Sequence, residues 1–534
     1  MPTPANNDEE LNRLRVQNAQ LHAALTGVTQ ERDHLHGELR TTRTERDLLK
    51  ERLRAFIRKL FAAKSEARGS DQRDLFFNEA EVLTLVGSAP APEAEQEPAP
   101  TITVPAHRRT KRGRKPLDPA LPREVIRHEL PEAERVCPHD GAALKEIGVE
   151  ASEQLDIIPQ QVRVIRHERV KYACPCCERG LKLAPAPAKI IPKGLFTEAA
   201  LAWVVSAKYQ DALPLYRQAA ILGRFGGEVS RNTLAASVVR VGEAVQPIIN
   251  LLRDTLLEAD LVHGDETELQ VLKEPGRAAT QKSYLWAQMS GSGPPIHLFT
   301  YAASRSGATA TELYRGIKAQ SALVTDGYET YGGVAVTFDL VHLGCWAHAR
   351  RRFIEAEAAL PKSTRTADQP AAQFVAAIGD LYKLEAQARA MSVAERHVLR
   401  DTQSRPAIER IQHLLLQHLH AVVPGSLLGK ALHYLSGQWP KLVRFLDNGL
   451  YPIDNNACEN AIRPFVIGRR NWLFADTQGG AKASANLYSL IETCKANGIE
   501  PYRYLCALFR ALPRARTLED YERLLPWRVA LDAQ

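Results

Sequence analysis

The chain has 534 residues, of which 45% are hydrophobic and 25% are charged, and its net charge at pH 7 is +7. This length exceeds what one hydrophobic core usually serves, so we expect several domains, and the composition excludes a disordered or fibrous chain. No run of about 18 apolar residues appears and the N-terminus is polar and acidic, which predicts a cytoplasmic protein with neither a membrane span nor a secretory signal.

A heptad repeat of apolar residues runs through the first sixty residues when Leu11 is placed at position a. Asn18 then occupies an a position, where it fixes the register of a coiled coil, and Arg32 and Arg46 at a favour two strands, because their long side chains reach solvent. Residues 1–64 are therefore predicted to form a leucine-zipper-like coiled coil that joins copies of the chain. The alternative is a solitary amphipathic helix.

The composition changes after this repeat. Residues 65–118 are predicted to be a linker, since Ala, Pro and Glu dominate residues 87–105 and cannot bury a core. The linker ends in a basic arm, residues 107–115, with six Lys or Arg and no acid, which suits a phosphate backbone. Arg112 and Arg114 in this arm are candidate minor-groove contacts, and the alternative is a solvated linker.

Four cysteines cluster in the next segment, residues 119–192, within a span of 41 residues. Cys174 and Cys177 form a CxxC knuckle, but the other half of the cluster is incomplete, since only one cysteine stands there. Zn²⁺ accepts nitrogen and carboxylate oxygen as well as thiolate, so a zinc-finger-like module remains chemically reasonable. The alternative is a degenerate knuckle without metal. The predicted Zn²⁺ ligands are Cys137, Cys174, Cys177 and Asp140, with His139 as the alternative to Asp140.

Residues 193–250 have a helical pattern, with a glycine-containing turn at residues 226–229. Two helices joined by such a turn are typical of a helix-turn-helix, whose last helix enters the major groove. Arg231 and Asn232, at the start of that helix, are then candidate DNA contacts. The alternative is a packing layer before the next domain. The predicted helices are 198–208, 213–222 and 231–245.

Two aspartates end short runs rich in β-branched residues: Asp265 ends 261–265, and Asp326 ends 322–326. Between them the sequence predicts strands at 283–288 and 296–301 and a helix at 308–317. Strand, strand, strand, helix, strand is the opening order of a ribonuclease-H-like sheet. The aspartates lie 61 residues apart, about what two returning strands and a crossover helix need.

A third carboxylate, Glu459, follows two asparagines, and either Asn455 or Asn456 can cap a helix and place the glutamate in its first turn. Two strand-end carboxylates and one helix glutamate can hold two Mg²⁺, or Mn²⁺, ions about 4 Å apart, as in-line phosphodiester chemistry requires. Either aspartate alone could be a turn residue or a helix cap, and Glu459 alone could form an i,i+4 surface ion pair with Arg463. Together they predict a DNA-cutting site with catalytic ligands Asp265, Asp326 and Glu459.

The 133 residues between Asp326 and Glu459 exceed a minimal core. The pattern predicts a fifth strand at 336–343, a helix at 346–360 and an all-helical insertion at about 361–450, within a catalytic domain at 251–500. A C-terminal helical tail follows at 501–534. Cys345 and His348 could be half of a metal site, but no second half is evident, which favours packing. Candidate DNA contacts in this region are Arg350, Arg351, Arg463, Arg469 and Arg470.

Several of these segments occur in an order that resembles one family, the insertion-sequence-66 family of transposases, within the wider Asp-Asp-Glu group. The resemblance covers nearly the whole chain, although the family usually shows CxxC where this chain has Asp140. The matching blocks are residues 263–267, 325–328, 344–351, 454–459, 462–464 and 468–474.

This resemblance implies a multidomain α/β transposase: a coiled coil, a small zinc-knuckle module, a helical DNA-binding segment, and a ribonuclease-H-like core with an all-helical insertion. Similar enzymes use Mg²⁺ to nick the ends of an insertion sequence and join them to target DNA. They act as a homodimer or higher multimer. Because such enzymes act on DNA, we expect a cytoplasmic, nucleoid-associated protein. Companion proteins encoded by the same element are further expected partners. Alternatives are a non-catalytic DNA-binding regulator and a nuclease that does not join.

Overall fold

A computed structural model describes most of the chain beyond the N-terminal third. The described residues are 13–32, 34–35, 38, 42, 124–128, 131, 139, 142–143, 149, 161–173 and 181–531. The basic arm and the four clustered cysteines lie outside them, as does Asp140, so those predictions stay predictions. The predicted domain boundaries also remain predictions. No helix among the described residues is long and apolar enough to cross a membrane.

Residues 13–32 are helical, as the heptad repeat predicts. Their apolar side chains face solvent: Leu14, Leu21, Leu25 and Val28 are 57–65% exposed. An exposed apolar stripe at heptad spacing is a surface that a second helix can cover. The two short strands β1 (Lys171–Ala173) and β2 (Leu181–Leu183) form a separate antiparallel pair.

The predicted helices of residues 193–250 are present, with boundaries shifted by one or two residues. Ser230 caps α6, since the backbone N–H of Thr233 donates to its Oγ at 3.1 Å. Ala483 of the later helix α16 (Gln478–Ala496) packs against Gly242 of α6, so closely that a methyl group added at Gly242 would overlap Ala483. These helices therefore do form a packing layer. Their bounds are α4 Glu198–Tyr209, α5 Leu215–Arg224, α6 Arg231–Ala244 and α7 Gln246–Leu257.

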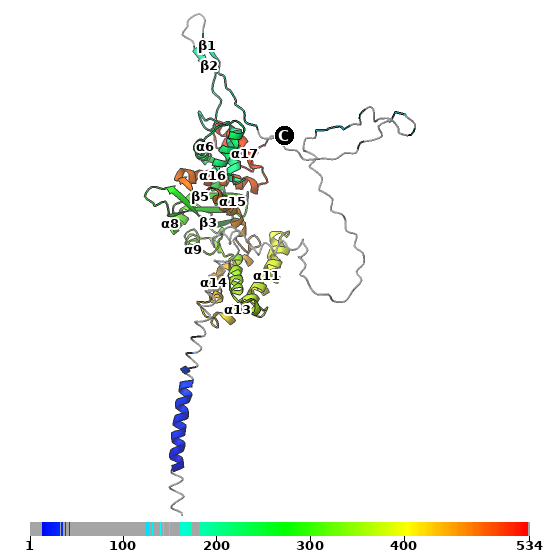
Figure 1. The fold of residues 1–534 in the computed structure, drawn as a ribbon. Helices are drawn as coiled ribbons and strands as arrows, with labels where there is room; N and C mark the ends of the chain where they lie inside the picture. The colour runs from blue at the N-terminus through cyan, green and yellow to red at the C-terminus, as the bar shows by residue number, and fades with distance from the viewer. Residues whose placement is uncertain are drawn as a thin grey trace, which may run out of the picture. The chain divides into compact units, whose positions relative to one another are not determined.

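A mixed sheet follows, with strand order β5-β4-β3-β6-β7 (Figure 1). Strand β3 pairs antiparallel with β4, and β4 pairs antiparallel with β5. On the other side of β3, the strands β6 and β7 run parallel to it. The bounds are β3 Leu261–Lys273, β4 Lys282–Ser290, β5 His297–Ala302, β6 Ala322–Val324 and β7 Val341–Leu343, with α8 Gly307–Leu313 and α9 Glu329–Thr337 between strands.

Two expectations about this sheet were wrong in detail. Strand β3 does not end at Asp265 but continues to Lys273, because its second half pairs with β4 and with β8 (Ala475–Thr477). The predicted strand at 336–343 is shorter, since its first residues belong to α9. Parallel neighbours such as β6 and β7 need a crossover connection, and α9 supplies it.

Helix α16 (Gln478–Ala496) covers the outer strand β5 (Figure 1). The backbone N–H of Phe299 donates to Ser489 Oγ at 2.8 Å, and that of His297 donates to Thr493 Oγ1 at 3.1 Å. An edge strand leaves backbone groups without ladder partners, and these hydroxyls satisfy some of them. The chain then continues through α17 (Pro501–Ala511), η6 (Leu512–Arg514) and α18 (Leu518–Glu522).

The residues between the sheet and Glu459 are helical, as predicted. Phe353 and Phe374 stack in their core with ring centroids 4.3 Å apart. The buried guanidinium of Arg400 forms an ion pair with Glu385, with Nη2 2.7 Å from Oε2. This ion pair connects η4 to α11. The elements are α10 Trp346–Ala359, η3 Lys362–Thr364, α11 Pro370–Ala388, α12 Val393–Leu399, the π-helical turn η4 Arg400–Ser404, α13 Arg405–Leu419, α14 Leu427–Leu442 and η5 Val443–Leu446.

Candidate active site

The three predicted carboxylates come from neighbouring elements. Asp265 lies on β3, and Asp326 lies two residues beyond β6, which pairs with β3 in the register His263 to Val324. Glu459 lies in the first turn of α15 (Asn456–Trp472), and α15 packs on β3 and β4. Asp265 and Asp326 are half-buried, whereas Glu459 is buried.

Electrostatics show that these groups share one environment. Burial raises the pKa of Asp265 well above its usual value, and the negative charges of Glu266, Asp326 and Glu459 raise it further. Like charges gathered in a partly dry site repel one another and favour a bound cation. Oxygen donors of this kind are what Mg²⁺ takes as ligands, so the donor set fits a divalent metal.

Asn455 connects the strand that carries Asp265 to the helix that carries Glu459. Its Nδ2 donates to the Gly264 carbonyl at 3.0 Å, and its Oδ1 accepts from His263 Nδ1 at 2.9 Å. Asn455 is fully buried. The sequence predicts a helix cap from Asn455 or Asn456, and Asn455 does occupy the N-cap position, but its side chain makes no capping hydrogen bond. The Asn455 side chain bonds to His263 and Gly264 of β3 instead.

The turn that carries Asp326 is held from two sides. The Tyr328 backbone N–H donates to Asp326 Oδ1 at 2.9 Å, and the hydroxyl of Tyr434, on α14, donates to the Asp326 carbonyl at 2.7 Å. Gly327 has a φ of 96°, which L side chains rarely adopt, and Tyr434 Oη lies 3.0 Å from where its Cβ would be. The helical insertion therefore helps to position the second aspartate.

Glu266, beside Asp265, is a fourth carboxylate at the site, and no local pattern in the sequence distinguishes it. Its Oε1 accepts from Arg305 Nε at 2.6 Å, and its Oε2 accepts from the Tyr331 hydroxyl at 2.5 Å. Burial raises the pKa of Glu266, against the opposing effects of Tyr331 and Arg305. Because its oxygens are engaged in this way, Glu266 is better suited to shape the field around Asp265 than to bind metal directly.

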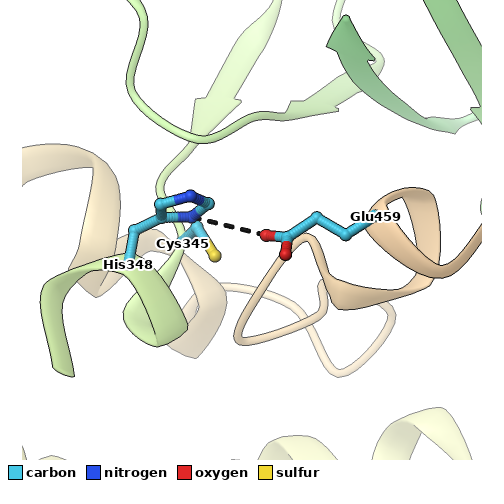
Figure 2. A group of neighbouring side chains, drawn as sticks. All are labelled: Cys345, His348 and Glu459. Carbon is cyan, nitrogen blue, oxygen red and sulfur yellow. Dashed lines mark ion pairs between the residues drawn. The ribbon is translucent and has the colours of Figure 1, made fainter. Parts of the chain in front are cut away.

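Glu459 has two cationic or ionisable neighbours from α10. His348 Nδ1 lies 3.5 Å from Glu459 Oε1 (Figure 2). Arg351 Nη2 lies 3.6 Å from Glu459 Oε2. Among the described residues, Cys345, His348 and Glu459 form a group whose possible ligand atoms all lie within 4.8 Å of one another, and Asp265 and Asp326 are not part of it. The expectation that Cys345 and His348 lack a partner is wrong, because the glutamate, far away in sequence, completes the group.

The predicted DNA contacts are placed unevenly. Arg231 and Asn232 are exposed at the start of α6, whereas Arg350 is only 6% exposed, which disfavours a phosphate contact. Arg463, Arg469 and Arg470 are half-buried on α15, and Arg469 donates to the Glu268 carbonyl. His139, the alternative zinc ligand, lies in an exposed turn. Arg112 and Arg114 lie outside the described residues.

Comparison with known families agrees with this arrangement. The family model described as "Transposase IS66 family" matches residues 193–483, which is more than half of the chain. The chain belongs to the IS66 family of transposases. Further IS66 models match other parts of it: a zinc-finger binding domain at residues 134–178, a C-terminal element at 489–527, and a segment described as "Transposase C of IS166 homeodomain" at 48–126.

Curated relatives of this IS66 family member come from Sinorhizobium fredii (strain NBRC 101917 / NGR234). The uncharacterised protein y4qI is 33% identical over 440 residues, which cover 79% of this chain and 80% of that protein. The uncharacterised protein y4jD is 32% identical over 428 residues, covering 77% and 82%, respectively. A third uncharacterised protein, y4hP, is 29% identical over 491 residues, covering 88% and 86%.

Proposed function

We propose that this chain is a DNA transposase that binds the ends of an insertion sequence, cleaves them and transfers the freed strands to target DNA. The observation that carries the proposal is the placement of Asp265 on β3, Asp326 just after β6 and Glu459 on α15, with the pKa of Asp265 raised by burial and by the charges of Glu266, Asp326 and Glu459. Membership of the IS66 family supports it.

The sheet also supports a ribonuclease-H-like assignment of the core. Three antiparallel strands, β3 to β5, followed by two parallel strands joined through helices, give the order β5-β4-β3-β6-β7. In this arrangement Asp265 lies on β3, and Asp326 follows the adjacent parallel strand β6. Glu459 lies on the later helix α15, which packs on β3 and β4, and its charge contributes to the raised pKa of Asp265.

In the mechanism, Asp265, Asp326 and Glu459 would hold two Mg²⁺ or Mn²⁺ ions. When bound, such ions activate the attacking oxygen and stabilise the leaving oxygen of a phosphodiester. The protein's part is to orient these carboxylates: Asn455 aligns the Asp265 strand with the Glu459 helix, and Tyr434 holds the Asp326 turn. No covalent link between protein and DNA is required.

Other parts of the chain would bind and assemble the DNA complex. The exposed N-terminus of α6, with Arg231 and Asn232, is proposed to enter the major groove, and the basic arm with Arg112 and Arg114 to follow the backbone. The zinc-finger match at residues 134–178 supports a bound Zn²⁺. The exposed stripe of the N-terminal helix is proposed to form the coiled coil of a dimer.

The test is incubation of purified protein with labelled element ends, target DNA and Mg²⁺, with nicked and joined products scored separately. Asp265→Asn, Asp326→Asn and Glu459→Gln should each abolish cleavage yet leave binding to the ends nearly intact, because no Arg or Lys is removed. Mg²⁺ should raise the melting temperature of the wild type but not of the variants, since ligand bound only to the folded state stabilises it. If a variant cleaved DNA at the rate of the wild-type protein, the proposed role of the substituted residue would be refuted. Nicking without joining would identify a nuclease, and end binding without cleavage by the wild type would identify a regulator.

A further inference from the structure

Cys345, His348 and Glu459 have the chemistry of a transition-metal site. Cys345 is the N-cap residue of α10 and His348 follows it by three positions, a spacing that places both side chains on one side of the helix start. Glu459 approaches from the first turn of α15, and Figure 2 shows the three side chains converging. Thiol, imidazole and carboxylate together are a donor set that Zn²⁺ accepts.

The separation between imidazole and carboxylate fits an intervening ion. His348 Nδ1 lies 3.5 Å from Glu459 Oε1 and makes no hydrogen bond, although the atom is shielded from solvent. Two ligands about 2.0–2.3 Å from a tetrahedral Zn²⁺ lie about 3.3–3.8 Å from each other. The pair is therefore at the distance of two ligands of one metal rather than of a hydrogen-bonded pair.

The surroundings of the three side chains also favour a metal. Cys345 Sγ accepts a hydrogen bond from the Asn455 backbone N–H at 3.3 Å, a contact of the kind that orients ligating thiolates. Arg351 lies near Oε2 of Glu459, whereas Oε1 is the carboxylate oxygen that faces His348.

We propose that Cys345, His348 and Glu459 bind one thiophilic divalent cation, Zn²⁺ by preference, with a fourth position open to water or a DNA phosphate. On binding, the Cys345 thiol releases its proton to solvent and the sulfur becomes a thiolate ligand. The site is separate from the zinc-finger match at residues 134–178.

This site has a regulatory consequence, which rests on the proposed function. Glu459 cannot serve fully as a ligand of the Mg²⁺ ions while it is bound to an ion held by Cys345 and His348, since the two roles draw on one carboxylate. Zn²⁺ at this position should therefore inhibit Mg²⁺-dependent cleavage. Excess Mg²⁺ should not readily reverse the inhibition, because Mg²⁺ competes poorly for thiolate and imidazole.

The test measures metal directly in the full chain. Protein reconstituted with Zn²⁺, and separately with Co²⁺ as a spectroscopic probe, is compared with Cys345→Ser and His348→Gln. The wild type should bind about one ion more than either variant, and its Co²⁺ spectrum should show extra thiolate charge-transfer intensity that Cys345→Ser lacks. Cys494→Ser is the matched control, because Cys494 is also a buried free cysteine but lies in α16, outside the group.

The outcomes separate the two proposals. Equal metal content in the wild type, His348→Gln and Cys345→Ser would overturn the site whether or not the protein cleaves DNA. His348→Gln guards against a folding defect in Cys345→Ser, since the nitrogen it replaces makes no hydrogen bond. If the metal difference is present but no protein cleaves, the site stands and the proposed function fails. If cleavage occurs, the Zn²⁺ concentration that halves it should rise at least tenfold in either variant, and an unchanged concentration would overturn the regulatory role.

Discussion

Replacing Asn455 with alanine removes the side chain that joins the Asp265 strand to the Glu459 helix. Two buried hydrogen bonds disappear, and the Gly264 carbonyl and His263 Nδ1 lose these partners. A buried polar group left without a partner costs about 1–3 kcal/mol, so the free energy of unfolding should fall by about 2–6 kcal/mol. A shift of the helix by a fraction of an ångström should also slow cleavage, on the order of 100-fold per folded molecule.

The matched control is Asn486→Ala. Asn486 is buried on α16, and its Nδ2 donates to the Gly242 carbonyl at 2.8 Å and to Gln246 Oε1 at 2.9 Å, far from the carboxylates in sequence and on different elements. Urea unfolding followed by tryptophan fluorescence should show a comparable loss for both variants, while strand cleavage at a temperature where both are folded should fall only for Asn455→Ala. Equal cleavage by the two variants would refute the aligning role of Asn455, and unchanged stability of Asn455→Ala would refute the hydrogen-bond account.

Three further predictions concern assembly, the zinc-finger segment and acid stability. Leu21→Lys combined with Leu25→Lys places charges in the predicted seam, so light scattering should show a smaller assembly, and an unchanged mass would exclude the coil as the oligomerising element. Cys174→Ser should lower zinc content and binding to element ends more than Cys176→Ser, because only the first breaks the CxxC spacing; equal zinc in both would contradict the ligand assignment. Burial lowers the pKa of His342 to about 3 from its usual 6.5, so the wild type should lose stability as pH falls below 6.5 toward 3. Protonation of His342 should lower the free energy of unfolding by about 2–3 kcal/mol between pH 7.5 and pH 4.5. In urea titrations at these two pH values, His342→Gln should lack this part of the loss, and an equal loss in both proteins would refute the assignment.

Much of the chain's order of elements follows from local patterns. The helices around α4 to α6, the strand runs that became β3 to β6, and the helical insertion all have periodicities that one segment reveals by itself. The boundaries of β3 did not follow, because Glu266 to Gln270 looks like a polar loop in the sequence, whereas in the structure it pairs with β4, and Val271 and Lys273 beyond it pair with β8. Strand extent is decided by partners, and partners are distant in sequence.

The site divides along the same line. Asp265, Asp326 and Glu459 could be proposed from the sequence because two follow short apolar runs and the third falls in the first turn of a predicted helix. The roles of Asn455, Glu266 and His348 depend on contacts across the fold: Asn455 reaches β3, Glu266 reaches Arg305 and Tyr331, and His348 reaches Glu459. In the sequence, a buried asparagine bridge and a helix cap look the same.

The helical insertion contacts the candidate active site at two points. Tyr434 of α14 holds the Asp326 carbonyl, and Tyr382 of α11 donates to Asp454 Oδ2 at 2.8 Å, immediately before Asn455. The guanidinium of Arg352 lies 4.0 Å over the Tyr434 ring, which links α10 to α14. One helical unit therefore touches the segments that carry the second aspartate and the glutamate. The core around which the insertion packs also contains Leu261 of β3, Ala322 and Val324 of β6 and Leu343 of β7. The insertion is therefore packed onto the sheet as well as bonded to the two segments, so it supports the positions of Asp326 and Glu459 together.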